Sequence, residues 1–272
     1  MNIVAIGDNV ADCYIDQNKY YPGGNAVNVA VNCKRSGAKK VSYIGVFATD
    51  DKATHIKYAL DEEGIDYSLS REVKGVSGQP KVNLTTEGDR VFVSSPQNTV
   101  QHKVKLRLTE EDMTYLRSYQ LCHTSCYSHL EDELSTLSKI LKVSFDFSEN
   151  YNPKYLEKVC PYISYAFFSG ANLTKGEIDS LIENLSQYNL EVIGITRGDK
   201  PAIFIKDVKI YHQNVLNVDI VDTMGAGDSF IGGFLTEYYT SNNMERSLQF
   251  AAKQASKTCG FFGGFGYGNE LV

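Results

Sequence analysis

The sequence predicts an α/β fold in which helices cover both faces of a mostly parallel β-sheet, with a small β-sheet inserted as a lid. Two observations predict it. Along most of the 272 residues, short apolar runs alternate with amphipathic segments, which is typical of strand–helix units in a parallel sheet. Between residues 75 and 100, single apolar and polar residues alternate instead, which indicates a hairpin with one face in water.

The first part of the chain supplies the first strand–helix units. The apolar and amphipathic runs predict a strand at Ile3–Ile6, a helix at Ala26–Arg35, a strand at Val41–Val46 and a helix at Lys52–Glu63. The second helix ends at Gly64, a residue that commonly follows the last helical turn. We expect the whole chain, residues 1–272, to form a single domain around this sheet.

The lid is expected to be built from two segments, within residues 12–22 and 75–100. In the second segment the apolar positions Val82 and Leu84 are followed by Val91 and Val93, with a turn at Glu87-Gly88-Asp89 between them. The polar, tyrosine-rich segment Cys13–Pro22 is expected to add strands to this hairpin.

The strand–helix pattern returns after Leu116. Strands are predicted at Leu121–His123, Lys142–Phe147, Tyr165–Ser169 and Glu191–Thr196, a hairpin at Ala202–Tyr211, and a further strand at Val215–Val221. Helices are predicted at Glu131–Leu141, Pro153–Tyr162, Lys175–Tyr188, Ser229–Tyr239 and Met244–Thr258.

Charge and apolar content exclude several classes of partner. The formal net charge is -6, and neither nucleic acid nor an anionic membrane surface attracts an acidic protein. No apolar run approaches the length of a membrane span, and Met1–Gly7 resembles a buried strand, not a signal peptide. A cytoplasmic protein with reduced cysteines is expected. The group Cys122-His123-Thr-Ser-Cys126 lacks the spacing of a zinc knuckle, so we interpret its thiols as buried structural groups.

The most informative segment for chemistry is Asp222-Thr-Met-Gly-Ala-Gly-Asp228, which lies between an extended run and an apolar helix. Its two glycines let the backbone approach a ligand closely. The amides of Gly225, Ala226 and Gly227 would lie at a helix N-terminus, where unpaired N–H groups favour an anion such as a phosphoryl group in transfer. Asp228 would then lie beside that anion hole, where a carboxylate can take the proton of an attacking hydroxyl. The alternative is purely structural: Asp222 or Thr223 caps the helix, and Asp228 complements its dipole.

A second polar segment lies near the other end of the chain. Gly23-Gly24-Asn25 opens the first helix, and Asn28 follows three residues later on the same face. Amide side chains both donate and accept hydrogen bonds, which suits sugar hydroxyls. Asp12, just after the first strand, could accept from paired hydroxyls. A glycine turn with asparagine caps is the structural alternative.

Together these motifs resemble the two signatures of the PfkB, or ribokinase-like, carbohydrate kinases, in the right order and at opposite ends of the chain. The resemblance implies a doubly wound α/β fold with a β-sheet lid, ATP and Mg²⁺ as cofactors, and phosphorylation of a primary hydroxyl. It implies catalytic roles for Asp228 and the anion-hole residues Gly225, Ala226 and Gly227. Substrate contacts are implied for Asp12, Gly23, Gly24, Asn25 and Asn28, and Arg90 on the lid could reach a substrate or phosphate or simply be solvated.

Within that family the chain is similar to bacterial fructoselysine 6-kinases. Ile6-Gly-Asp-Asn9, Asp89-Arg-Val-Phe92 and Phe145-Asp-Phe-Ser148 carry this closer resemblance. It implies a small-molecule sugar substrate, the 6-hydroxyl of fructoselysine or a related fructosamine. A kinase for another sugar or nucleoside, and an inactive sugar-binding regulator, are the alternatives. A monovalent cation and a homodimer formed through the lid are further expectations.

Two motifs depart from the family pattern. The usual Asn-x-x-Glu magnesium motif is Asn172-Leu-Thr-Lys175 here, and the nearest acid is Glu177, which becomes the candidate metal residue. The nucleotide loop Thr196-Arg-Gly198-Asp-Lys-Pro201 has proline where a second glycine is usual, and proline lacks a backbone donor. Nucleotide contacts are expected from Asn172, Thr196, Gly198 and Thr223.

Overall fold

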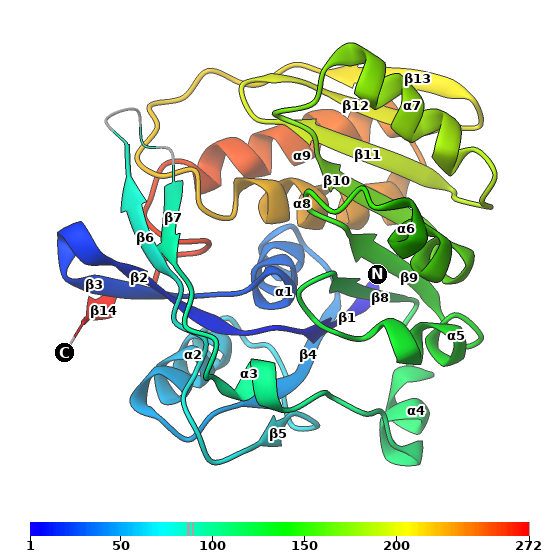
Figure 1. Ribbon diagram of the computed structural model, residues 1–272. Coiled ribbons are helices and arrows are strands. Elements are labelled where there is room, and N and C mark those ends of the chain that lie inside the picture. Colours follow the sequence, from blue (N-terminus) through cyan, green and yellow to red (C-terminus); the bar gives the residue numbers. More distant parts are fainter. Residues whose placement is uncertain (86–87, 89, 272) are drawn as a thin grey trace.

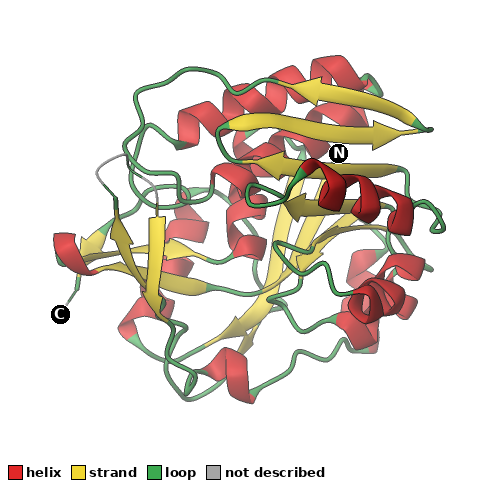
Figure 2. Ribbon diagram, turned by 45° about the horizontal axis from the view of Figure 1, so that its top comes forward, coloured by secondary structure: helices red, strands yellow, loops and turns green. Residues whose placement is uncertain are grey.

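The computed structural model describes residues 1–85, 88 and 90–271. A large sheet with helices on both faces forms the body of the protein, and a smaller sheet projects from one side of it (Figures 1 and 2). The predicted fold class is therefore confirmed.

Among the described residues the large sheet has nine strands, and eight of them run in the same direction. In spatial order they are β13 (Lys209–Gln213), β12 (Lys200–Lys206), β11 (Val192–Arg197), β10 (Tyr165–Ser169), β9 (Lys142–Asp146), β8 (Leu121–Ser125), β1 (Asn2–Gly7), β4 (Lys40–Phe47) and β5 (Arg71–Glu72). The strand of opposite direction is β12, which pairs antiparallel with both β11 and β13. The chain builds outward in opposite directions from the neighbouring strands β1 and β8, so the sheet has a switch point between them. In open α/β sheets, ligands bind at such a point, at the carboxyl ends of the strands.

Helices cover both faces because the central strands are buried along nearly their whole length. Figure 1 shows the group α1 (Asn25–Arg35), α8 (Ala226–Ser241) and α9 (Met244–Thr258) on one face, with α6 (Pro153–Val159) and α7 (Lys175–Leu185) on the other. The remaining helices are α2 (Asp51–Glu62), α3 (Val100–Lys103), α4 (Glu110–Leu116) and α5 (Leu134–Leu137), with the short 3₁₀ turns η1 (Ile15–Gln17), η2 (Glu131–Glu133) and η3 (Cys160–Tyr162). Among the described residues, none of these helices combines the length and the apolar character needed to cross a bilayer.

The smaller sheet is the lid. Its order is β14 (Asn269–Glu270), β3 (Lys19–Gly23), β2 (Val10–Tyr14), β6 (Lys81–Leu84) and β7 (Arg90–Ser94). The predicted hairpin is therefore present as the antiparallel pair β6–β7, although Glu87 and Asp89 of its predicted turn lie outside the described residues. Tyr14, Tyr21 and Val82 form an apolar core for the lid together with Met224 from the loop before α8.

Two predicted elements are wrong. Val215–Val221 is not a strand: the segment between β13 and α8 is irregular, because it crosses from the sheet edge to α8 with Val215 and Ile220 exposed and no neighbouring strand. The predicted helix Glu131–Leu141 consists only of η2 and α5, since the chain turns after Leu137 to enter β9.

Candidate active site

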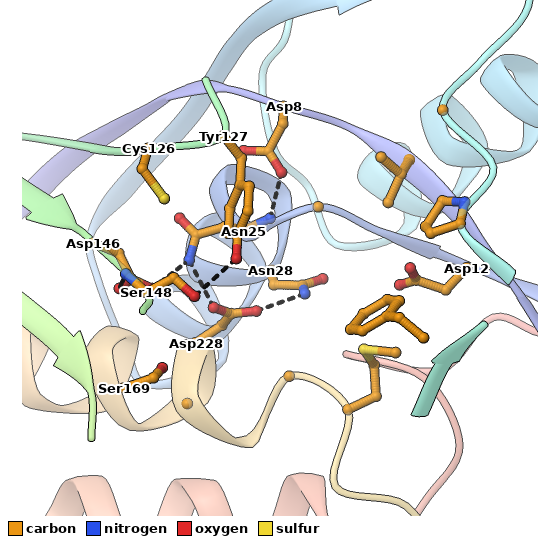
Figure 3. Close-up of a pocket in the computed structure, with 18 of the residues that line it drawn as sticks. Asp8, Asp12, Asn25, Asn28, Cys126, Tyr127, Asp146, Ser148, Ser169 and Asp228 are labelled. Carbon is orange, nitrogen blue, oxygen red and sulfur yellow. Dashed lines mark hydrogen bonds between the residues drawn. The ribbon is translucent and has the colours of Figure 1, made fainter. Parts of the chain in front are cut away.

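A cavity of about 570 Å³ lies between the lid and the carboxyl ends of the large sheet. Its walls come from the ends of the central strands, from the first turns of α1 and α8, and from the lid. Polar residues that line it include Asp8, Asp12, Asn25, Asn28, Arg90, Tyr127, Asp146, Ser148, Ser169, Thr196 and Asp228, and Figure 3 shows most of them converging on one space. The cavity lies where the switch point predicts it.

The N-terminus of α8 forms one wall. Gly225 is its N-cap residue with φ +72°, a left-handed conformation that favours glycine. A Cβ on Gly225 would lie 2.6 Å from the Cα of Gly264, so backbone replaces side chain at this point. In the part of the chain that the structure describes, the amides of Gly227 and Asp228 donate to no backbone carbonyl. These are the unpaired amides at which a helix binds an anion.

The structural alternative for this turn is wrong in one respect, because no side chain caps α8. The buried Asp222 carboxylate instead accepts hydrogen bonds from the Tyr14 hydroxyl, from the Met224 amide at 2.9 Å and from the Gly263 amide at 2.8 Å. Asp222 therefore joins the loop before α8 to lid strand β2 and to the loop at residues 260–268.

Asp228 projects from the first turn of α8 and is held by two amide side chains. Asn25 Nδ2 donates to its Oδ1 at 2.8 Å, and Asn28 Nδ2 donates to its Oδ2 at 2.7 Å, as Figure 3 shows. Burial raises the pKa of Asp228 to about 6, while the hydrogen bond from Asn28 and the charge of Arg90 lower it. The carboxylate is thus ionised at neutral pH and more basic than an exposed aspartate.

Asn28 has a polar atom left over. Its Oδ1 is buried and has no hydrogen-bond partner among the described residues. A buried acceptor without a donor is costly, and Asn28 lines the cavity. Its oxygen is therefore available to a ligand hydroxyl.

Two aspartates that the sequence interpretation did not single out also belong to the site. Asp146, at the end of β9, accepts from Asn25 Nδ2 at 2.8 Å, and burial raises its pKa to about 7, helped by the charge of Asp228. Asp8, just after β1, accepts from the Asn25 amide at 2.7 Å, which fixes the start of α1. Both lie at carboxyl ends of parallel strands, and that position is the signal that could have identified them.

Asp12 faces the cavity from the lid. It is 3% exposed, and its carboxylate makes no hydrogen bond to any described residue. Burial raises its pKa to about 7, against the charge of Arg90, which lowers it. A Cβ on Gly23 would lie 2.1 Å from Asp12 Oδ2, so the first glycine of the pair makes room for this carboxylate. The second, Gly24, is the N-cap of α1 with φ +105°.

Arg90 and Thr223 connect the lid to the loop before α8. The Thr223 amide donates to the Gly88 carbonyl at 3.2 Å, and Arg90 Nη1 donates to the Thr223 carbonyl at 3.1 Å. Arg90 lines the cavity, whereas Thr223 does not. Thr223 was expected to contact the nucleotide. The structure instead places it in contact with the lid, outside the lining of the cavity.

Of the other residues expected to contact the nucleotide or the metal, one lines the cavity and the rest lie outside its lining. Thr196, in β11, lines the cavity, while Gly198 is exposed in the turn to β12 with φ +63°. Asn172 is exposed outside the cavity lining. Glu177 accepts from both the amide and the hydroxyl of Thr174 at 2.7 Å and completes a capping box at the start of α7. The motif Thr174-x-x-Glu177 is a signal of this cap that the sequence already contained.

The cavity thus combines an ionised, partly buried carboxylate, a helix N-terminus with unpaired amides, and polar side chains for a hydroxyl-rich ligand. That combination suits transfer of a phosphoryl group to an alcohol. Residues 2–264 match the model of the pfkB family carbohydrate kinases, and the chain belongs to that family. It is therefore an ATP-dependent carbohydrate kinase, and kinases of this family use ATP together with Mg²⁺.

Two curated relatives and one solved structure are similar to this chain along most of its length. The chain is 43% identical over 268 residues to the fructosamine kinase FrlD of Bacillus subtilis (strain 168), covering 98% of this chain and 94% of the relative. It is 31% identical over 267 residues to the fructoselysine 6-kinase of Escherichia coli (strain K12), covering 96% and 98%. Among solved structures, the ribokinase of Arabidopsis thaliana complexed with ribose and ATP has a TM-score of 0.81 at 17% identity, covering 96% and 93%. That likeness shows the fold.

Proposed function

We propose that this kinase phosphorylates the 6-hydroxyl of a fructosamine, with fructoselysine as the first candidate substrate. The observation that carries the proposal is the 43% identity to a fructosamine kinase along nearly the full length of both chains. The site described above is compatible with it, since its cavity of about 570 Å³ has room for a ligand larger than a free hexose.

In the proposed reaction, Asp228 orients the substrate hydroxyl and accepts its proton. The hydroxyl oxygen forms a bond to the γ-phosphorus of ATP as the bond from that phosphorus to the bridging oxygen breaks, and ADP leaves. Asn25 and Asn28 hold the Asp228 carboxylate by one oxygen each, which fixes its direction without filling all its lone pairs. The amides of Gly225 and Gly227 would lie against the transferring phosphoryl group. The Ala226 amide, which was expected to join them, donates to the Thr223 carbonyl at 3.2 Å instead.

The residues present fit a nucleotide with Mg²⁺, although not through Glu177. Mg²⁺ prefers hard oxygen ligands and is usually bound by one or two carboxylates together with substrate phosphates. Among the described residues there is no cluster of three or more ligating side chains, but the Asp146 carboxylate lines the cavity close to Asp228. We therefore assign Asp146 as the carboxylate available to the metal. When bound, the metal would neutralise charge on the phosphates.

Sugar hydroxyls are proposed to bind on the side of α1 and the lid. Asn28 Oδ1 has no donor among the described residues, and the Asp12 carboxylate lines the cavity beside it. Gly23 makes room for the Asp12 carboxylate, and Gly24 lets the start of α1 lie close to the backbone of Asp8 and Asn9. Arg90 contributes a positive charge at the lid. Thr196 would contact the nucleotide from the end of β11.

Three further proposals concern the oligomeric state, a monovalent cation and the location in the cell. A second copy of the chain is proposed to pair at β7, the exposed edge of the lid. A monovalent cation is proposed to assist turnover, which a comparison of rates in potassium and choline chloride at equal ionic strength tests. A cytoplasmic location is proposed because ATP is the cosubstrate and the buried thiols of Cys13, Cys33 and Cys122 form no disulfide.

A panel of acceptors tests the substrate. ADP release is measured with fructoselysine, fructose, ribose and adenosine, using Asp228→Asn as the control for background ATP hydrolysis. The expected result is a kcat/KM at least about ten-fold higher for fructoselysine, since unmatched polar groups discriminate strongly between substrates. Equal or better turnover of fructose or ribose contradicts the fructosamine assignment. Unchanged turnover by Asp228→Asn contradicts the role of the base.

A further inference from the structure

A buried histidine lies directly behind the catalytic carboxylates. His123, in the middle of β8, is fully buried and does not line the cavity. Its Nε2 lies 3.0 Å from Asn25 Oδ1, and its Nδ1 lies 3.0 Å from the Ser144 hydroxyl on β9. The same Asn25 side chain donates to both Asp146 and Asp228. A continuous chain of hydrogen bonds therefore runs from β9 through β8 and α1 to α8.

The chemistry of the partners fixes the direction of every bond in this chain. Asn25 Nδ2 faces two carboxylate oxygens, so it must carry the hydrogens, and Oδ1 must face the histidine. An amide oxygen only accepts, so His123 Nε2 must carry the hydrogen. A neutral imidazole then accepts at Nδ1, and the Ser144 hydroxyl donates to it.

The imidazole is suited to this task because it stays neutral. Burial lowers the pKa of His123 to about 3, so the ring keeps a single N–H throughout the neutral range. Reversing the Asn25 amide would place its oxygen against the Asp146 and Asp228 carboxylates and leave the histidine N–H without an acceptor. His123 thus opposes the one rotation that would remove the donor from both carboxylates.

We propose that His123 is a positioning residue for phosphoryl transfer: its Nε2–H holds the Asn25 amide in the orientation that aligns Asp228 with the substrate hydroxyl. Ser144 supports it by selecting the tautomer. The inference rests on the proposed role of Asp228 as the base and adds a residue that touches neither substrate nor nucleotide.

Two histidine variants of different reach test the proposal. Gln at position 123 can place an N–H where Nε2 lies, whereas the shorter Asn reaches only the position of Nδ1. His123→Gln is expected to keep kcat within about three-fold of the wild type, and His123→Asn to lose about ten-fold, as for one displaced hydrogen bond. The KM for ATP should change by less than about two-fold in both, because His123 itself does not line the cavity.

A double-mutant cycle shows whether the effect passes through Asn25. In an Asn25→Ala background, His123→Asn is expected to cause no further loss of kcat, since the group it positions is already gone. Thr124→Val, which removes a buried hydroxyl with no partner from the same strand, is the matched control and should leave kcat within about two-fold. Thermal unfolding of each variant reports stability separately.

The tautomer can be observed without turnover. Nitrogen-15 NMR of labelled histidine should show a neutral His123 ring protonated at Nε2 from pH 8 down to pH 5, with the signal assigned through His123→Gln. Equal losses of kcat in His123→Gln and His123→Asn, a loss that persists in the Asn25→Ala background, or a ring protonated at Nδ1 overturns the proposal. Full activity of Asp228→Asn would instead overturn the proposed function, so the two failures are distinguishable.

Discussion

Asp228 must be ionised to accept a proton, and its surroundings bring its pKa close to the working range. Burial raises this pKa to about 6, while Asn28, Arg90 and Asn25 lower it. We expect kcat/KM to be nearly constant from pH 7 to 8 and to fall about ten-fold per unit well below pH 6, as the carboxylate becomes protonated. Because Asp146 titrates nearby, the measured midpoint belongs to the interacting pair. Direct quantification of the phosphorylated product between pH 5 and 8 checks this, and a flat profile contradicts it.

Asp12 illustrates a conflict between stability and function. Burial raises its pKa from 3.8 to about 7, so the folded state loses stability as the pH rises from about 4 through 7 and Asp12 must carry a charge. Asp12→Asn removes that cost. We expect its free energy of unfolding at pH 8 to exceed that of the wild type by on the order of 2 kcal/mol, and the gain to vanish near pH 4.

Chemical denaturation at both pH values measures this difference, and Asp16→Asn on the same lid is the control because Asp16 is exposed. The Asp12 variant should nevertheless lose activity, since one of the two accepting oxygens becomes an amide donor and the negative charge is lost. A stability gain of equal size at pH 4 and pH 8 would show that the charge is not its source.

At the scale of single residues, the sequence motifs predicted the functional side chains at the starts of α1 and α8. They did not predict the side chains that contact them. Asp228, Asn25 and Asn28 were predicted from two short motifs, and the structure places them in direct contact. Asp146 could have been identified from its position at the carboxyl end of β9. His123 could not be assigned, because a polar residue in the middle of a buried strand gives no indication of what lies behind it. Glu177 was predicted as a metal residue from its position near Asn172, whereas the competing cap motif with Thr174 describes its contacts.

The two glycines in the turn into α8 differ in what surrounds them. A Cβ on Gly225 would strike the backbone of Gly264 and the residue has φ +72°, whereas a Cβ on Gly227 meets nothing within 4 Å. Gly225→Ala should therefore lose about 1–3 kcal/mol of stability and about a hundred-fold in kcat, as the anion hole shifts. Gly227→Ala should fold with the stability of the wild type.

Thermal unfolding and kcat of the two variants check this contrast. If Gly225→Ala and Gly227→Ala lose the same stability, the close approach of Gly264 is not what requires glycine at position 225.

The β6–β7 hairpin contributes charge to the site as well as a cover. Arg90 lowers the pKa of both Asp12 and Asp228 through its positive charge. Arg90→Met is expected to move the acid limb of the pH profile upward by about half a unit, whereas Arg90→Lys should leave it in place. An equal shift in both variants would assign the effect to the contact between Arg90 and Thr223, not to charge.

Elements were easier to predict than their ends or their partners. Long periodic segments such as Met244–Thr258 were predicted with the observed bounds. The apolar residues of 215–221 misled the prediction, because they repeat like a strand yet have no neighbouring strand to pair with. Local pattern records how a segment alternates but not whether an adjacent strand exists.

At the scale of the whole molecule, the lid ends in the exposed edge strand β7. All five residues of β7 are exposed, with Val91 49% and Val93 58% exposed, and an unpaired apolar edge readily pairs with another chain. We expect a dimer in light scattering and a monomer for Val91→Lys. Ile210→Lys, at the exposed edge strand β13 of the large sheet, is the control and should keep the wild-type mass. A monomeric wild-type protein contradicts the proposed pairing.

The contribution of residues 263–270 to the lid and to the turn before α8 imposes an order on biosynthesis. Asn269 and Glu270 pair with β3 at the outer edge of the lid, and Gly263 and Gly264 hold the loop that carries Asp222 and Gly225. Domains generally fold as units during synthesis, so we expect the catalytic cleft to form only after residues 263–270 have left the ribosome. A chain truncated before Gly263 is therefore expected to show no kinase activity.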